Sequence, residues 1–253
     1  MRVVAVYSTK GGVGKTTTAV NLAWQASQTL RVLLWDLDPQ GAATFLLKVK
    51  PKVKGGVASL VDGRSRTAAA IRSSAFADLD VLPADASYRD LDLVLDAAKK
   101  SDRQLTRLLE QVSDDYDLVI LDCPPGASLV AENAVHSADA VVVPLVPAPL
   151  TMRSLEQVEQ VVADSSSKAS IVAFFSMVDR RKSAHRDTVA RLPASHASVS
   201  DVAVPATVTI ERMGSHRAPL QSFAPSSEAA RAYSALWDRV QSVVKAKAGK
   251  RRR

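Results

Sequence analysis

The segment STKGGVGKTT (residues 8–17) decides the fold of this chain. It follows the apolar, β-branched run VVAVY and precedes TAVNLA, which has helical spacing, so the order is strand, glycine loop, helix. In that order the backbone N–H groups of Gly11, Gly12, Val13 and Gly14 turn towards phosphate oxygens at the positive end of the helix. The segment therefore predicts a phosphate-binding loop.

The residues that end this loop carry its chemistry. Lys15 is expected to reach the β- and γ-phosphates of a nucleotide, the Thr16 hydroxyl to ligate Mg²⁺, and Thr17 to complete the nucleotide-binding set. One position is irregular, because Thr9 stands where the plain pattern G-x-x-x-x-G-K-[ST] has its first glycine. A second lysine, Lys10, follows it directly, and the loop pattern alone does not explain this residue.

Apolar runs rich in β-branched residues recur along the chain and alternate with segments of helical period. Runs that are apolar on both faces are typical of parallel strands covered by helices on each side. The predicted strands cover residues 3–7, 32–37, 79–84, 118–122, 140–146 and 171–178, and the predicted helices cover residues 16–27, 88–98, 104–112, 128–136, 155–163 and 229–244. This alternation predicts an α/β fold with a doubly wound, mostly parallel sheet flanked by helices on both faces.

The organisation of the chain predicts a single domain, residues 1–253, in which a basic C-terminal helix and tail begin near residue 226. Ser226 or Ser227 is the expected N-cap of that helix, with Glu228 in its first turn. Two stretches have the composition of loops: residues 48–56, which carry four lysines, and residues 195–206, a polar connection with a strand start at its end.

Acidic residues follow two of the predicted strands. Asp36 and Asp38 come at the carboxyl end of residues 32–37, the edge at which open α/β sheets bind ligands. Asp38 is expected to orient or deprotonate a water that attacks the γ-phosphate, or to hold a metal-bound water; the alternative is a helix cap before Pro39. Asp122 ends the strand at 118–122 and is expected to hold Mg²⁺ directly or through water.

The net charge of +7 is unevenly distributed. Residues 1–167 hold 17 Lys/Arg and 20 Asp/Glu, a net of −3, whereas residues 168–253 hold 16 and 6, a net of +10. A basic last third is typical of a surface that faces nucleic acid or anionic lipid, and a solvated basic tail is the simpler alternative.

The single cysteine, Cys123, is expected to be a small buried residue and indicates a reducing compartment. No apolar run reaches the length of a membrane span.

Five segments together resemble one family. They resemble, in order and spacing, the ParA/MinD family of deviant Walker P-loop ATPases, and the later segments are closest to its ParA-type members. The five segments are KGGVGKTTTAVNLA, DLDPQGAAT, LDCPPG, VDRRKSAHR and RAPLQSFAPSSEAARAY. The resemblance implies an ATP hydrolase, slow and stimulated by a partner, with ATP and Mg²⁺ as cofactors. It also implies that Lys10 reaches the phosphates bound by the other subunit of an ATP-dependent homodimer, that Lys15 and Thr16 bind phosphate and Mg²⁺, that Asp38 positions the water, and that Asp122 supports the metal.

The same resemblance implies that the ATP-bound dimer binds non-specific DNA and is released when a ParB-like or cargo-adaptor protein stimulates hydrolysis. A cytoplasmic, nucleoid-associated protein without a stable membrane anchor, which segregates or positions DNA or a protein cargo, would behave in this way. Adenine is expected near Met177 and Pro205. The expected DNA contacts are Arg180, Arg181, Lys182, Arg186, Arg212, Arg217, Lys245 and Lys247, together with the terminal residues 250–253.

Three rival functions are possible on the same scaffold. A MinD-like membrane-cycling ATPase needs bulky apolar residues in an amphipathic tail, whereas the stripe at 229–244 is largely alanine and valine. An amide-forming biosynthetic ligase is expected to need additional segments that a chain of 253 residues has no length for. An iron–sulfur reductase needs more cysteines than one.

Overall fold

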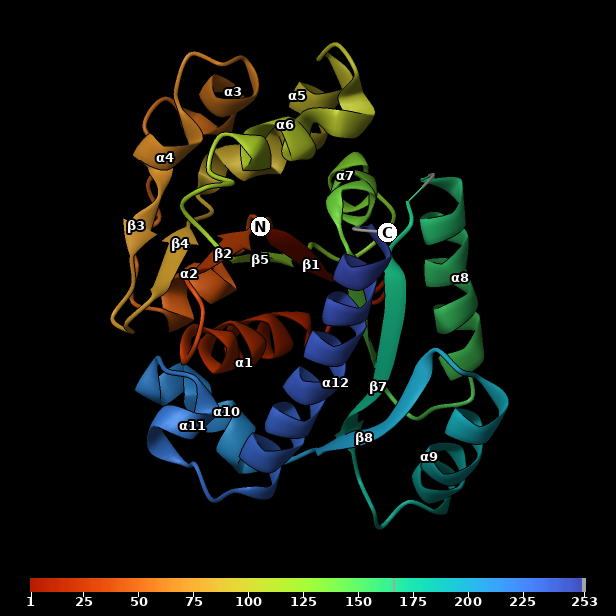
Figure 1. The fold of residues 1–253 in the computed structure, drawn as a ribbon. Coiled ribbons are helices and arrows are strands. Elements are labelled where there is room, and N and C mark those ends of the chain that lie inside the picture. The colour runs from red at the N-terminus through yellow and green to blue at the C-terminus, as the bar shows by residue number, and fades with distance from the viewer. Residues whose placement is uncertain (166, 252–253) are drawn as a thin grey trace.

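The protein is described by a computed structural model that covers residues 1–165 and 167–251, with the side chains of residues 247–251 outside the description. An eight-stranded sheet in the order β3-β4-β2-β5-β1-β6-β7-β8 forms its centre (Figure 1). All pairings are parallel except that of β3 with β4. The strands are β1 (Arg2–Val6), β2 (Val32–Asp36), β3 (Arg72–Ser73), β4 (Leu79–Leu82), β5 (Leu118–Asp122), β6 (Ala140–Leu145), β7 (Ser170–Val178) and β8 (Val199–Pro205).

The sheet separates two hydrophobic cores, as the doubly wound arrangement predicted. Successive side chains of a strand point to opposite faces. In β1, Val3 and Ala5 belong to one core and Val4 and Val6 to the other. Because β1 lies in the middle of the sheet and is covered on both faces, its side chains from Val3 to Val6 are all apolar and buried.

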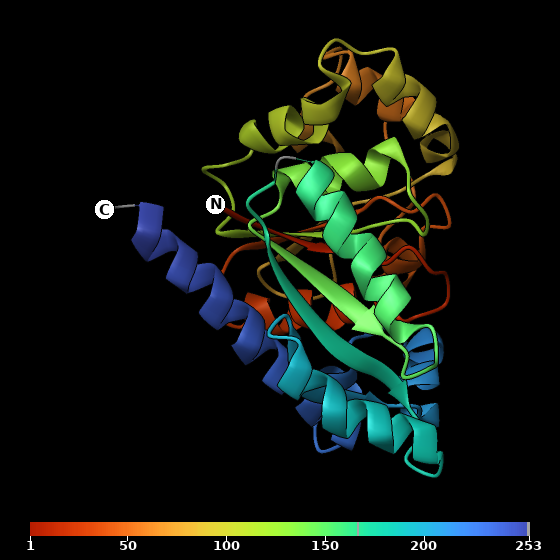
Figure 2. The same cartoon turned by 90° about the vertical axis from the view of Figure 1, so that its right-hand side faces the viewer.

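Helices cover both faces (Figures 1 and 2). One core is covered by α1 (Lys15–Ser27), α2 (Ala42–Leu46), α10 (Val208–His216), α11 (Leu220–Phe223) and α12 (Glu228–Arg251). The other is covered by α3 (Gly56–Val61), α4 (Thr67–Ala70), the 3₁₀ turn η1 (Ala86–Asp90), α5 (Leu91–Asp96), α6 (Gln104–Glu110), α7 (Leu129–Ser137), α8 (Thr151–Asp164) and α9 (Ser183–Ser195). A second 3₁₀ turn, η2 (Ser101–Arg103), precedes α6.

The six predicted strands and six predicted helices are all present, with ends that differ by a few residues. Ser227 is the cap of α12, since its hydroxyl accepts a hydrogen bond of 3.2 Å from the N–H of Ala230. The segment 48–56 is a loop as expected until Gly56 starts α3.

The expected strand start near the end of residues 195–206 is present, but the strand is longer than expected: residues 199–205 form β8, which pairs with β7 from Ala173 to Val178. An edge strand has only one neighbour, so several of its side chains stay partly exposed and its sequence lacks a continuous apolar run. In the described part of the chain, no helix combines the length and the apolar character that crossing a membrane requires.

Candidate nucleotide site

The phosphate loop lies where β1 ends and α1 begins. Gly12 and Gly14 have left-handed backbone conformations, with φ of 69° and 93°, which residues with a Cβ disfavour. A Cβ at Gly14 would also lie 3.0 Å from the hydroxyl oxygen of Ser176 on β7. The loop therefore needs glycine at position 14 both for its turn and for its contact with the sheet.

The two lysines of the loop have different environments. Lys15 is 7% exposed, and its ammonium donates a hydrogen bond to the backbone carbonyl of Lys10, with 2.9 Å between Nζ and the oxygen. Burial lowers the pKa of Lys15, while the carboxylates of Asp122 and Asp38 act in the opposite direction. The Lys10 side chain is exposed and has no ion-pair partner within residues 1–165 and 167–251. One lysine is thus held inside the site and the other extends into solvent.

Two carboxylates meet beside the loop. β2 and β5 are parallel neighbours in a register that sets Asp36 next to Asp122, and both residues are fully buried. The hydroxyl and backbone N–H of Thr44 donate to one oxygen of Asp36, at 2.7 and 2.8 Å. Neither oxygen of Asp122 has a hydrogen-bond partner of good geometry among the described residues. Burial raises the pKa of Asp36 to about 6, and burial together with the Asp36 carboxylate raises the pKa of Asp122 well above its usual range.

These carboxylates fit a bound cation. A buried carboxylate without a partner is unfavourable, and a metal ion removes that penalty. The Thr16 hydroxyl lies near enough to Asp122 to lower the pKa of its carboxyl group, and hydroxyl and carboxylate oxygens are ligands that Mg²⁺ prefers. No cluster of three His, Cys, Asp or Glu side chains suited to a metal occurs in the described ranges. The arrangement suits Mg²⁺, which usually takes further ligands from phosphates and water.

Asp38 lies in a tight turn directly after β2. Its Oδ1 accepts a hydrogen bond of 2.9 Å from the N–H of Gln40, and its carbonyl accepts one of 2.9 Å from the N–H of Gly41. The helix that follows, α2, has Gly41 as its N-cap and no side-chain cap, so the alternative of Asp38 as a helix cap does not hold. The turn holds the Asp38 carboxylate near enough to Lys15 for its charge to oppose, in part, the lowering of the Lys15 pKa by burial.

The loop after β5 packs on the phosphate loop. The N–H of Gly126 donates to the carbonyl of Thr9 at 3.1 Å, and the Gly126 carbonyl accepts from the Tyr7 hydroxyl at 3.1 Å. Residues 124–126 are therefore connected directly to the segment that would carry the γ-phosphate. Cys123 is 1% exposed, and burial raises the pKa of its thiol, which confirms the expectation of a small buried residue.

The two residues expected near adenine end neighbouring strands. Val178 of β7 pairs with Pro205 of β8, so Met177 and Pro205 lie close along the same edge. Met177 has a left-handed φ of 57° and is 46% exposed, which removes it from the core. Contact between these residues and a base stays a prediction.

The residues expected to contact DNA lie at two ends of the sheet. Lys245 lies near the end of α12, beside Arg2 and Asp117 at the amino ends of β1 and β5. The Lys247 side chain and residues 252 and 253 lie outside the described residues. The rest follow the carboxyl end of β7 or belong to α10 and its C-terminal end: Arg180, Arg181, Lys182, Arg186, Arg212 and Arg217. Figure 2 shows how α12 extends from one end of the sheet to the other.

Two of these arginines already have acidic partners. Arg180 forms an ion pair of 2.6 Å with Glu228, in the first turn of α12. Arg181 binds Asp179 at 2.9 Å, and hydrogen bonds from Arg181 lower the pKa of Asp179 to about 2. Both arginine side chains are more than two-thirds exposed, at 70% and 91%, so their outer N–H groups stay accessible.

Arg217 packs against α2. Its Nε donates to the Phe45 carbonyl at 3.0 Å, and its guanidinium carbon lies 4.4 Å from the centroid of the Phe45 ring. Sequence reasoning missed this contact and the Thr44–Asp36 contact, since no spacing in the chain relates residue 217 to residue 45. Through Thr44 and Phe45, α2 connects the buried Asp36 to the segment that carries Arg217.

Comparison with known sequences places these features in a family. The AAA domain family model matches residues 1–171, which include the phosphate loop, Asp38 and Asp122. The sporulation initiation inhibitor protein Soj of Bacillus subtilis is 30% identical over 240 residues, with 92% of this chain and 95% of Soj covered. The chromosome partitioning protein ParA of Caulobacter vibrioides is 30% identical over 246 residues, with 93% and 92% covered.

Solved structures share the fold. A Cyanothece McdA variant in complex with ATP superposes with a TM-score of 0.82 at 18% identity, covering 95% of this chain and 96% of that one. A cobyrinic acid a,c-diamide synthase from Mycobacterium smegmatis, with an ATP analogue and magnesium, superposes with a TM-score of 0.76 at 28% identity, covering 94% and 93%. The synthase matches over nearly its whole length, so the length of this chain does not exclude that class of enzyme, contrary to the expectation from sequence. The motifs, the sheet order and the two partition proteins agree: this chain belongs to the ParA/MinD family of P-loop ATPases.

Proposed function

We propose that this chain is a ParA-type ATPase that dimerises on binding ATP and Mg²⁺ and binds non-specific DNA as a dimer. A ParB-like or cargo-adaptor protein then stimulates hydrolysis and releases the monomers, so that repeated cycles segregate or position DNA or a protein cargo. The working place of such a cycle is the cytoplasm, on the nucleoid.

The observation that carries this proposal is the contrast between the two lysines of the loop. Lys15 is buried against the Lys10 carbonyl, whereas the Lys10 ammonium is exposed beside a phosphate site that already has its own cation. A two-fold partner can present such a cation to the γ-phosphate from the opposite side, where it stabilises charge as an arginine finger does. Lys10 would then make ATP a signal for dimerisation.

The test is the Lys10→Ala variant, compared with Lys99→Ala, which removes an exposed lysine elsewhere. With ATP and Mg²⁺, sedimentation is expected to show dimers for the wild type and for Lys99→Ala, and monomers for Lys10→Ala. Binding of a fluorescent ATP analogue by the monomer should change less than about threefold, because Lys15 and the loop backbone are intact. Dimers of undiminished stability in Lys10→Ala would refute the cross-subunit role of this residue.

The hydrolytic step is tested at Asp38. Asp38→Ala removes the carboxylate held next to Lys15, and an ATP-bound dimer that stays on DNA is the expected result. Turnover at the wild-type rate would exclude Asp38 from the mechanism.

DNA binding is proposed for the basic side chains beyond β7 and in α10, with Lys245 as a separate contact. Phosphate contacts give affinity without sequence choice and a steep dependence on salt. Charge reversal of Arg212 or Lys245 should weaken binding to unrelated duplexes equally and reduce the salt slope by about one unit, without loss of ATP binding. Affinity unchanged across a salt series would remove these residues from the interface.

A MinD-like membrane cycle is less well supported. Tyr233, Leu236 and Val240 of α12 are buried in the core beside α1, so the apolar stripe of this helix already packs on its own domain. Membrane insertion requires an apolar face that is free to enter the lipid.

An amide-forming synthase is the rival suggested by the name of the M. smegmatis structure. The two functions differ in what accelerates ATP hydrolysis. DNA with a partner protein should stimulate a ParA-type ATPase, whereas stimulation by cobyrinic acid and an ammonia donor would favour the synthase.

A further inference from the structure

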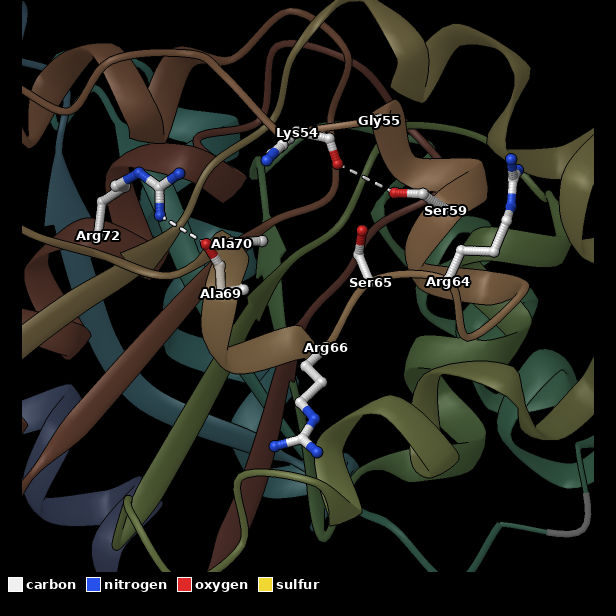
Figure 3. Close-up of a pocket in the computed structure, with 9 residues that line it drawn as sticks. All are labelled: Lys54, Gly55, Ser59, Arg64, Ser65, Arg66, Ala69, Ala70 and Arg72. Carbon is white, nitrogen blue, oxygen red and sulfur yellow. Dashed lines mark hydrogen bonds between the residues drawn. The ribbon is translucent and has the colours of Figure 1, made fainter.

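A basic hollow lies away from the nucleotide site, between α3 and α4 (Figure 3). Its volume is about 580 Å³, and it is lined by Lys54, Gly55, Ser59, Arg64, Ser65, Arg66, Ala69, Ala70 and Arg72. Four of these nine residues are cations, and no acidic residue lines the hollow in the described part of the chain. The hollow is thus a concave surface of one sign of charge.

The charge around this hollow is concentrated locally. Residues 48–72 carry seven Lys/Arg and one acid, Asp62, a net of +6, whereas the other residues up to 167 hold 10 Lys/Arg and 19 Asp/Glu, a net of −9. Concave basic surfaces focus the electrostatic field and attract anions. A basic segment within an acidic region is therefore expected to attract one part of an acidic partner.

Two cations face the hollow, and hydrogen bonds hold the backbone of one and the guanidinium of the other. Figure 3 shows the Lys54 ammonium and the Arg72 guanidinium on the same side of the hollow, while the Ser65 hydroxyl lies nearer to Ser59. The Arg72 guanidinium donates to the carbonyls of Ala69 and Ile71 at 2.9 and 2.7 Å, which fixes it and leaves other N–H groups available. The Lys54 carbonyl accepts from the Ser59 hydroxyl at 3.1 Å, so the base of the lysine is held while its ammonium has no ion-pair partner among the residues described.

The other two cations lie at the rim. Arg64 is paired with Asp62 at 2.8 Å, and Arg66 points away from the centre of the hollow. Arg64 and Arg66 extend the positive electrostatic field around the opening, and their side chains do not occupy the hollow. Within the hollow, the cations that an anionic group can reach are therefore Lys54 and Arg72.

We propose that this hollow is the docking site for an acidic segment of a partner protein, with Asp or Glu carboxylates placed between Lys54 and Arg72. The proposal rests on the proposed ATPase cycle only for the role of that partner. A duplex presents its phosphates on a convex cylinder, which cannot enter a hollow of this size, whereas a single acidic side chain can. Figure 1 also shows α3 and α4 at the opposite end of the molecule from α10, which carries the proposed DNA contact Arg212 and is followed by Arg217.

The position of the hollow connects it to the catalytic turn. Asp38 is followed by α2, and α2 by the segment that ends at Lys54. That segment is anchored where the N–H of Val53 donates to Asp85 at 2.8 Å and the N–H of Val57 donates to Ser87 at 2.8 Å. A partner held at Lys54 would therefore act on the anchored end of the segment that connects this hollow, through α2, to Asp38.

The experiment measures binding of a fluorescein-labelled hexaglutamate peptide by anisotropy, with the full chain in 50 mM salt and without nucleotide or DNA. The wild type should bind, and Lys54→Glu with Arg72→Glu should weaken binding at least tenfold. Lys54→Glu alone, which disturbs no described side-chain contact, should weaken it at least threefold, so an unstable double variant does not end the test. The matched control is Lys99→Glu with Arg153→Glu, an equal change of net charge at exposed sites elsewhere, which should alter binding less than twofold.

Several outcomes would overturn the proposal: no binding by the wild type, equal losses in control and hollow variants, or full binding by Lys54→Glu. Displacement of the peptide by a 24-base-pair duplex, together with loss of duplex binding in Lys54→Glu, would identify a nucleic-acid contact instead. Because the peptide-binding measurement contains no nucleotide, failure of the Lys10 experiment would leave its result unchanged.

Discussion

Thr44 provides the most direct test of how α2 supports the nucleotide site. It is 1% exposed, and its hydroxyl makes two buried contacts: it donates to Asp36 at 2.7 Å and accepts from the N–H of Ala84 at 3.1 Å. Thr44→Val keeps the shape of the side chain and removes only the hydroxyl. Thr44→Ser is the matched control, because it keeps the hydroxyl and removes a methyl group.

The expected magnitude follows from the two groups that lose a partner. A buried polar group left unsatisfied costs about 1–3 kcal/mol. Asp36 keeps its bonds from the N–H groups of Thr44 and Asp38, so we expect Thr44→Val to lower the free energy of unfolding by about 2–4 kcal/mol. Loss of one buried methyl group in Thr44→Ser should cost about 1 kcal/mol.

The loss should also depend on pH. The pKa of Asp36 is raised to about 6 in the folded protein, and removal of a hydrogen bond to the carboxylate raises it further. The hydrogen bond from the Thr44 hydroxyl stabilises the ionised form of Asp36 more than its protonated form. The destabilisation by Thr44→Val should therefore be larger at pH 8 than at pH 5.

The assay is equilibrium unfolding in urea at these two pH values, without nucleotide. If Thr44→Val and Thr44→Ser unfold with free energies within about 0.5 kcal/mol of each other at pH 8, the hydroxyl does not stabilise Asp36 as argued.

Three further predictions concern the loop and its carboxylates. Gly14→Ala places a Cβ 3.0 Å from the Ser176 hydroxyl oxygen at a φ of 93°, so binding of a fluorescent ATP analogue should fall at least tenfold, and unchanged affinity would contradict the required turn. Asp122→Asn removes a buried carboxyl group that has no hydrogen-bond partner and whose ionisation burial disfavours, so the melting temperature without ligand should not fall, while the stabilisation by ATP with Mg²⁺ should be lost; calorimetry that shows full stabilisation would exclude Asp122 as metal support. In the wild type without ligand, Asp36 binds a proton more tightly in the folded state than in the unfolded state. Relative to Asp36→Asn, the free energy of unfolding of the wild type should therefore fall by about 3 kcal/mol as the pH rises from 4 to above 6. Parallel pH profiles of the two proteins would refute this titration.

The central strands could be predicted because their signal is local. Residues 118–121 and 140–145 are buried on both faces, so each shows as a continuous apolar run in the sequence. β3, two residues long, and the edge strand β8 lack that signal. For an edge strand, pairing with one neighbour stabilises the strand more than its own composition indicates.

The sequence by itself determined the phosphate loop, the order of strands and helices, and the family, because glycine conformations and apolar periods depend on neighbouring residues. Only the tertiary structure decided that Asp36 lies next to Asp122, that Arg217 packs on Phe45, and that Lys54 and Arg72 face one hollow. These contacts join residues that are 18 to 172 positions apart, and the register of the sheet and the packing of α2, α3 and α4 bring them together. The raised pKa values of the buried carboxyl groups therefore arise from burial and from pairing between distant residues, which no local pattern in the chain encodes.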